Sequence, residues 1–107
     1  MVTIVRGAQD RYVSALKNAL EEYEKQMPGA TADVYRQNSA SVRIRVVDQH
    51  FGGMSKADRH EELWKFLEAR VDRDVLEEVS VLLPLAPSEL ERSLANIDFE
   101  HPQRSEL

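Results

Sequence analysis

At 107 residues, with 42% apolar and 31% charged side chains, the chain is expected to form one globular domain rather than two, and not a disordered or fibrous protein. It has no cysteine, no signal-peptide core and no run near the roughly 20 apolar residues of a membrane span, so disulfides and thiolate chemistry are excluded and a cytoplasmic protein is expected. A net charge of −5 argues against non-specific nucleic-acid binding as the main activity, because that affinity comes from phosphate neutralisation by lysine and arginine.

A first helix is expected over residues 9–26, preceded by residues 1–8, which show no clear pattern and are interpreted as a leader. The apolar residues of this helix recur at spacings of three and four, so they share one face. They are Val13, Leu16, Leu20, Tyr23 and Met27. Pro28 and Gly29 then end the helix, and its apolar face is expected to cover a sheet.

Two strands are expected next, over residues 32–37 and 41–48, joined by a polar turn. In the second strand Arg43 and Arg45 alternate with apolar residues, so they should lie on the face of the sheet away from the core. Arg36 on the first strand is expected to join them in a basic stripe. The stripe is interpreted first as the solvated face of a sheet, and otherwise as a possible nucleic-acid-binding surface.

The second half of the chain predicts a helix over residues 57–70, a short helix after Asp72, a strand over residues 79–85 and a last short helix over residues 87–94. Pro84 indicates that this strand lies at an edge, because proline has no N–H to donate. A strand, two helices and a strand form a right-handed crossover, so the last two strands should be parallel. Residues 96–107 are expected to fray.

These elements follow the order α-β-β-α-α-β-α, which predicts a single α/β (α+β) domain over residues 1–107, with its core in residues 9–95. The sheet should be three-stranded and mixed, with the helices on one face. The two central helices also have the order of a helix-turn-helix unit.

Residues 51–60, where the second strand gives way to a helix, carry the strongest candidate site. Gly52 and Gly53 permit a sharp turn, Ser55 is placed to cap the helix, and Phe51 is expected to anchor the turn in the core. Arg59 and His60 are harder to explain by folding alone, because a cation in the first turn of a helix opposes the helix dipole.

The pattern F-x-G-x-S-x-x-x-R-H resembles the signature of the BolA family, and it is formed by Phe51, Gly53, Ser55, Arg59 and His60. The resemblance extends over residues 34–94. It implies a fold like the type II KH domain and a small non-enzymatic protein that binds a monothiol glutaredoxin. It also implies a [2Fe-2S] cluster shared with that partner, and a role in iron homeostasis or in transcriptional regulation of cell shape and stress response. The five signature residues are then the expected partner-binding residues.

The chain departs from the family at the positions that hold the cluster. Relatives supply one ligand from a histidine just before the third strand, where this chain has Glu78, and another from the loop between the first two strands, which here is short and has neither histidine nor cysteine. A basic residue usually follows the Arg-His pair, and here Glu61 does. Because iron–sulfur clusters favour thiolate and imidazole ligands, cluster ligation is expected to be impaired, and no cofactor or metal site of its own is predicted.

Two functions are therefore considered. The first is a BolA-like adaptor or regulatory protein that binds a glutaredoxin-type partner in iron–sulfur or stress-related regulation. The alternative is a nucleic-acid-binding regulator that uses the helix-turn-helix-like unit or a KH-like sheet face with Arg36, Arg43 and Arg45. Against the alternative, residues 51–80 hold five basic and eight acidic residues, and the turn is not a KH-type GXXG clamp. Enzymatic activity is the least supported, since no catalytic motif is present.

Overall fold

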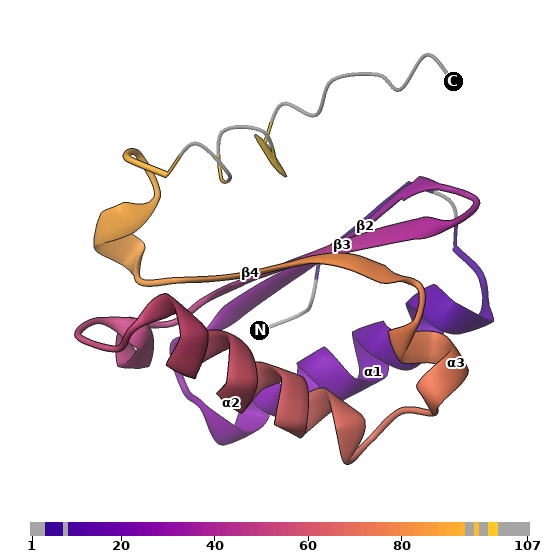
Figure 1. The fold of residues 1–107 in the computed structure, drawn as a ribbon, viewed down its shortest axis with the longest axis horizontal. Helices are drawn as coiled ribbons and strands as arrows, with labels where there is room; N and C mark the ends of the chain where they lie inside the picture. Colours follow the sequence, from indigo (N-terminus) through magenta and orange to yellow (C-terminus); the bar gives the residue numbers. More distant parts are fainter. Residues whose placement is uncertain (1–3, 8, 94–95, 97–98, 101–107) are drawn as a thin grey trace.

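The computed structural model describes residues 4–7, 9–93, 96, 99 and 100. Its elements, in chain order, are β1 (Ile4–Arg6), α1 (Arg11–Gln26), β2 (Thr31–Asn38), β3 (Ser41–Val47), the 3-10 helix η1 (Gln49–Phe51), α2 (Lys56–Glu68), α3 (Arg73–Leu76), β4 (Val79–Leu85) and the 3-10 helix η2 (Pro87–Glu89). The strands form one mixed sheet in the order β1-β2-β3-β4. The three α-helices lie together on one side of the sheet (Figure 1). Within the described residues, no helix has the length and apolar character needed to cross a membrane.

The sheet has four strands, so the expected three-stranded sheet is wrong by one strand. Ile4–Arg6 pairs in parallel with β2, with Ile4 opposite Asp33 and Arg6 opposite Tyr35. The interpretation of residues 1–8 as a leader is therefore wrong for Ile4–Arg6, which belong to the sheet. Three residues are too few to show an alternating pattern. The strand forms because α1 is a crossover connection that brings β2 alongside β1.

The expected mixed sheet packed against helices is confirmed. The β2–β3 pair is antiparallel, while β4 is parallel to β3 and joined to it by α2 and α3. The edge position expected from Pro84 is also confirmed, because β4 is the outermost strand on its side. The core between the layers includes these fully buried residues: Leu16 and Leu20 of α1, Val34 of β2, Val42, Ile44 and Val46 of β3, and Leu63 and Leu67 of α2.

Several expectations for the helices and the C-terminal segment need correction. The short helix expected after Asp72 is confirmed as Arg73–Leu76, but its four residues form a single turn, which is too short to be the recognition helix of a helix-turn-helix unit. In place of a helix over residues 87–94 there is a 3-10 helix over Pro87–Glu89, and Leu94 lies outside the described residues. Asn96 and Phe99 are buried, at 4% and 1% exposure, where fraying was expected. Residues 97–98 and 101–107 lie outside the described residues.

Candidate functional site

Residues 51–60 connect β3 to α2 in the way their sequence predicts. Phe51 is fully buried and holds the turn to the core. Gly53 has a φ of +87°, a conformation that side chains with a Cβ rarely adopt. Ser55 caps α2, because its side-chain oxygen accepts a hydrogen bond from the Asp58 N–H at 3.1 Å. Three of the five signature residues are therefore occupied in shaping the turn.

Arg59 is a buried structural residue rather than a surface contact. Its side chain is 6% exposed, and its two terminal nitrogens donate to the two carboxylate oxygens of Glu89 at 2.5 and 2.9 Å. It also donates to the carbonyls of Met54, at 3.1 Å, and Pro84, at 3.4 Å. Arg59 thus ties the start of α2 to the preceding turn, to β4 and to η2. These bonds give Arg59 a role inside the fold, and its expected role as a direct partner contact stays a prediction.

His60, the next residue, is exposed and lies on a groove at the edge of the sheet. Its ring stacks on that of Trp64, with centroids 6.0 Å apart and planes 16° apart. The groove has a volume of about 640 Å³. Its lining comes from the first turns of α2 (Lys56, Arg59, His60), from residues 82–85 of β4, and from Glu89, Arg92 and Ser93. We call it the β4 groove.

The edge of β4 is closed to a further strand at Pro84. The Leu85 carbonyl accepts from the Asp48 N–H and so faces β3. The backbone groups of successive strand residues point to opposite sides, so those of Pro84 face the free edge. There Pro84 offers a carbonyl but no N–H. The Arg59 guanidinium bonds that carbonyl at 3.4 Å. This part of the β4 groove therefore offers apolar side chains rather than a free hydrogen-bonding backbone.

Glu89 is held in its charged form at the end of the β4 groove. The hydrogen bonds from Arg59, together with one from the Ala86 N–H, lower the pKa of Glu89 to about 2. The positive field of Lys56 acts in the same direction. With Arg59 and Glu89 bonded to each other, Lys56 and Arg92 are left as the exposed cations beside the apolar floor.

The low pKa of Glu89 predicts a pH-dependent contribution to stability. A carboxyl whose pKa is depressed in the folded state stabilises it above the ordinary pKa of 4.5, and this stabilisation is lost as pH falls toward about 2. Because about a third of the side chain is exposed, Glu89→Gln should lower the free energy of unfolding at pH 7 by about 1–2 kcal/mol, less than the full pKa shift implies. The difference from the unsubstituted protein should shrink as pH falls from 4.5 toward 2.

Urea denaturation at several pH values measures this effect. Glu91→Gln is the matched control, since Glu91 is exposed and two residues away, and it should change stability little at any pH. A Glu89→Gln deficit that stays constant down to pH 2.5 would mean that the carboxylate charge is not what stabilises the fold.

The expected basic stripe is not a free surface. Arg36 shares the helix-facing side of β2 with the buried residues Ala32 and Val34, so its placement with Arg43 and Arg45 is corrected. Its side chain is 5% exposed and paired with Asp10 at 2.7 Å and with Glu78 at 2.9 Å. Glu78, which stands where the resemblance expects a cluster ligand, is therefore engaged by an internal arginine.

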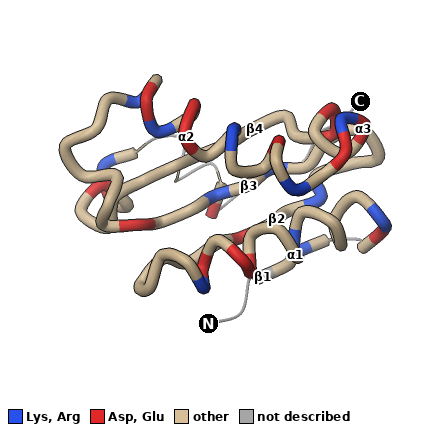
Figure 2. The backbone as a smooth tube through the Cα atoms, turned by 90° about the horizontal axis from the view of Figure 1, so that it is seen from below, with Lys and Arg blue, Asp and Glu red and all other residues tan. Residues whose placement is uncertain are grey.

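Arg43 and Arg45 do lie on the open face of the sheet, but Arg45 is largely covered. Its side chain is 13% exposed and forms an ion pair with Asp33, and it donates to Asn96 at 2.8 Å and to Glu100 at 2.6 Å. Arg43 donates to Gln37 at 2.8 Å. Along the helices of the opposite side, basic and acidic residues are both present (Figure 2).

Phe99 covers this face and was missed by the sequence reasoning. The guanidinium groups of Arg6 and Arg45 each lie 5.0 Å from its ring centroid, and Tyr35 meets it edge-on. Arg6 also donates to the Phe99 carbonyl at 3.0 Å. A lone aromatic in a polar segment was the available signal, and it indicates an anchor rather than a frayed end.

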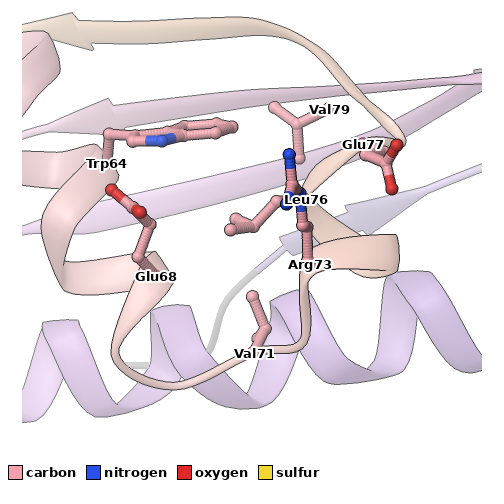
Figure 3. Close-up of a pocket in the computed structure, with 7 residues that line it drawn as sticks. All are labelled: Trp64, Glu68, Val71, Arg73, Leu76, Glu77 and Val79. Atoms are coloured by element: carbon pink, nitrogen blue, oxygen red, sulfur yellow. The ribbon is translucent and has the colours of Figure 1, made fainter.

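A second hollow, of about 550 Å³, lies between α2, α3 and the start of β4. Trp64 reaches into it from α2, and Arg73 stands opposite on the α3 side (Figure 3). Its remaining lining residues are Val71, Leu76 and Val79, which are apolar, and Glu68 and Glu77, which are acidic. We call it the Trp64 hollow. Four apolar side chains line it, and two carboxylates and one guanidinium supply its charge.

In the part of the chain that the structure describes, no three His, Asp or Glu side chains are grouped so as to hold a metal ion. Among the described residues, two could supply imidazole ligands, and each is engaged elsewhere: His50 pairs with Glu62 at 2.7 Å, and His60 stacks on Trp64. His101 lies outside the described residues. A scan against protein-family models, a search of curated proteins and a search of solved structures each found no match to this chain.

Proposed function

We propose that the chain is a non-enzymatic BolA-like adaptor that binds a glutaredoxin-type partner protein through the β4 groove, in iron–sulfur or stress-related regulation. The order α1-β2-β3-α2-α3-β4, with β2 antiparallel and β4 parallel to β3, agrees with the fold that the resemblance implies. The strand β1 is an addition to that plan. Because fold alone does not decide function, the proposal depends on the residues at the junction.

The exposure of His60 is the observation that carries the proposal. Of the five signature residues, Phe51 and Arg59 are buried and Gly53 and Ser55 shape the turn, while His60 stands exposed on the wall of the β4 groove. Its ring is positioned by stacking on Trp64 and has room for a partner. A pre-positioned aromatic beside an apolar floor and a basic rim is the kind of surface that anchors a protein partner.

The proposed adaptor binds its partner without a conventional shared cluster. Glu78 is only 23% exposed at its side chain and is paired with Arg36, so it does not fit the role of a cluster ligand. A carboxylate is also a poor replacement for imidazole at an iron–sulfur centre. The proposal therefore rests on protein contacts alone.

The test is titration calorimetry with a purified monothiol glutaredoxin. His60→Ala is expected to weaken binding at least about tenfold, as for an interface anchor, while stability changes by less than about 0.5 kcal/mol because the ring is exposed. His50→Ala is the matched control: it also removes an exposed histidine but lies outside the β4 groove, and it should bind as the unsubstituted chain does. Absence of binding by the unsubstituted chain at micromolar concentrations would reject a glutaredoxin-type partner.

The placement of the arginines counts against the nucleic-acid alternative. Arg36 is enclosed between two carboxylates, and Arg45 is covered by Asn96 and Glu100. Phosphate binding requires accessible cations, and the described part of the sheet face offers few. No specific observation favours this alternative over the adaptor.

A further inference from the structure

The β4 groove and the Trp64 hollow lie along one seam between α2 and β4. Lys56, His60, Trp64 and Glu68 recur every four residues, so they form one stripe along α2. The first two line the β4 groove and the last two line the Trp64 hollow. The stacked rings of His60 and Trp64 link the two hollows, because His60 lines the β4 groove and Trp64 lines the Trp64 hollow. We call the whole the α2–β4 seam.

The length of the seam matches a short extended peptide. It follows β4, which has seven residues and contributes Val79 to one hollow and residues 82–85 to the other. At roughly 3.3 Å per residue, β4 is about 20 Å long, which six or seven residues of an extended partner segment would span.

The two ends of the seam carry opposite charge. Beside residues 82–85, Arg59 is neutralised by Glu89, so Lys56 and Arg92 leave this end positive. In the Trp64 hollow, Glu68 and Glu77 outnumber Arg73, so the other end is negative. An apolar middle between unlike charges selects a partner segment of matching polarity, because like charges placed together would oppose binding.

Recognition along the seam must come mainly from side chains. Pro84 has no N–H, and its carbonyl is bonded by Arg59, so an added strand would lose its hydrogen bonds there. This excludes an uninterrupted β-strand addition, and with it the pairing of two β4 edges from two copies of the chain.

We propose that the α2–β4 seam binds an extended segment of a partner protein that has acidic residues at one end, a bulky apolar residue in the middle and basic residues at the other end. The acidic end lies against Lys56 and Arg92, the apolar side chain lies against Trp64, and the basic end lies against Glu68 and Glu77. This inference rests on the proposed function in taking the His60 face as the partner surface, and it adds the chemistry of the segment bound there.

Trp64 provides the measurement, because it is the only tryptophan in the chain. The probe is a synthetic hexapeptide without tryptophan that has two glutamates at one end, two leucines in the centre and two lysines at the other end. Its titration should shift the Trp64 emission and saturate with a Kd of about 100 μM or tighter. A peptide of the same composition with alternating charges should bind at least about tenfold more weakly.

Two variants of the chain locate the binding. Lys56→Glu should weaken binding of the ordered peptide at least about fivefold, because it reverses the charge at the basic end. Lys65→Glu is the matched control, since Lys65 is on the same helix, is 70% exposed and lines neither hollow, and it should leave binding unchanged. Equal binding of the two peptides, an unchanged Trp64 emission, or equal effects of the two variants would overturn the proposal. Self-association that Lys56→Glu weakens would also overturn it, in favour of a second copy as the occupant.

The outcomes for the seam and for the adaptor function are separable. Binding of glutaredoxin without binding of the ordered peptide would overturn the inference about the segment and leave the adaptor function in place. Binding of the ordered peptide without binding of glutaredoxin would support the seam and reject the glutaredoxin-type partner.

Discussion

Replacing Arg59 with leucine is expected to lower the free energy of unfolding by about 3 kcal/mol, because it removes one partner of a buried ion pair. The Arg59 side chain is 6% exposed, and its loss leaves Glu89 without its two charged hydrogen bonds. The carbonyls of Met54 and Pro84 lose a donor as well. The effect should lie toward the lower end for buried pairs, since Glu89 is 34% exposed and water can partly replace the guanidinium.

Urea denaturation followed by Trp64 fluorescence measures the loss. Arg11→Leu is the matched control, because Arg11 also pairs with a carboxylate, Asp74, at 2.8 Å, but with side chains 65% and 48% exposed. That substitution should destabilise the fold much less than Arg59→Leu, because exposed ion pairs contribute little. If Arg59→Leu were as mild as Arg11→Leu, the signature arginine would have to be reassigned from the fold to the partner surface.

Replacing Phe99 with alanine is expected to lower the free energy of unfolding by about 2–4 kcal/mol, as for a buried aromatic residue. The ring is 1% exposed, and the guanidinium groups of Arg6 and Arg45 each lie 5.0 Å from its centroid. Its removal takes away the apolar cover of the open sheet face. It also weakens the hold on Asn96 and Glu100, which bond Arg45.

Phe99→Leu is the control for Phe99→Ala. Leucine keeps most of the apolar volume but cannot accept the two cations on an aromatic face, so it should recover part of the stability and not all of it. Thermal and urea unfolding of the full-length chain give both values. A loss below about 0.5 kcal/mol for Phe99→Ala would contradict the packing of this segment on the sheet.

The helix and strand predictions succeeded where a repeating pattern ran for several residues. The spacing of apolar residues placed α1, and the alternation around Ile44 placed β3 with its buried and open faces. They failed where the element was too short to carry a pattern, as at Ile4–Arg6, or where one apolar residue decided the outcome, as at Phe99. In both cases the missing information was which distant part of the chain lies alongside.

The same limit applies to the candidate site. The sequence marked residues 51–60 and separated the turn and the cap from the Arg-His pair, but it treated Arg59 and His60 as one contact. Glu89, thirty residues further on, bonds Arg59 inside the fold, whereas His60 is exposed. The sequence likewise placed Arg36 with the open-face arginines, although it faces the helices and pairs with Glu78, 42 residues away.

The sequence by itself determined what depends on local sterics and periodicity: the amphipathic α1, the buried face of β3, the Ser55 cap and the closure of the β4 edge by Pro84. Only the tertiary structure decided the partners of the charged residues, the position of β1 and the existence of the α2–β4 seam. The physical reason is that the sequence around a charged side chain or a three-residue strand contains no repeating pattern from which its contact in the fold can be predicted. Its partner is chosen when the folded chain brings distant elements side by side.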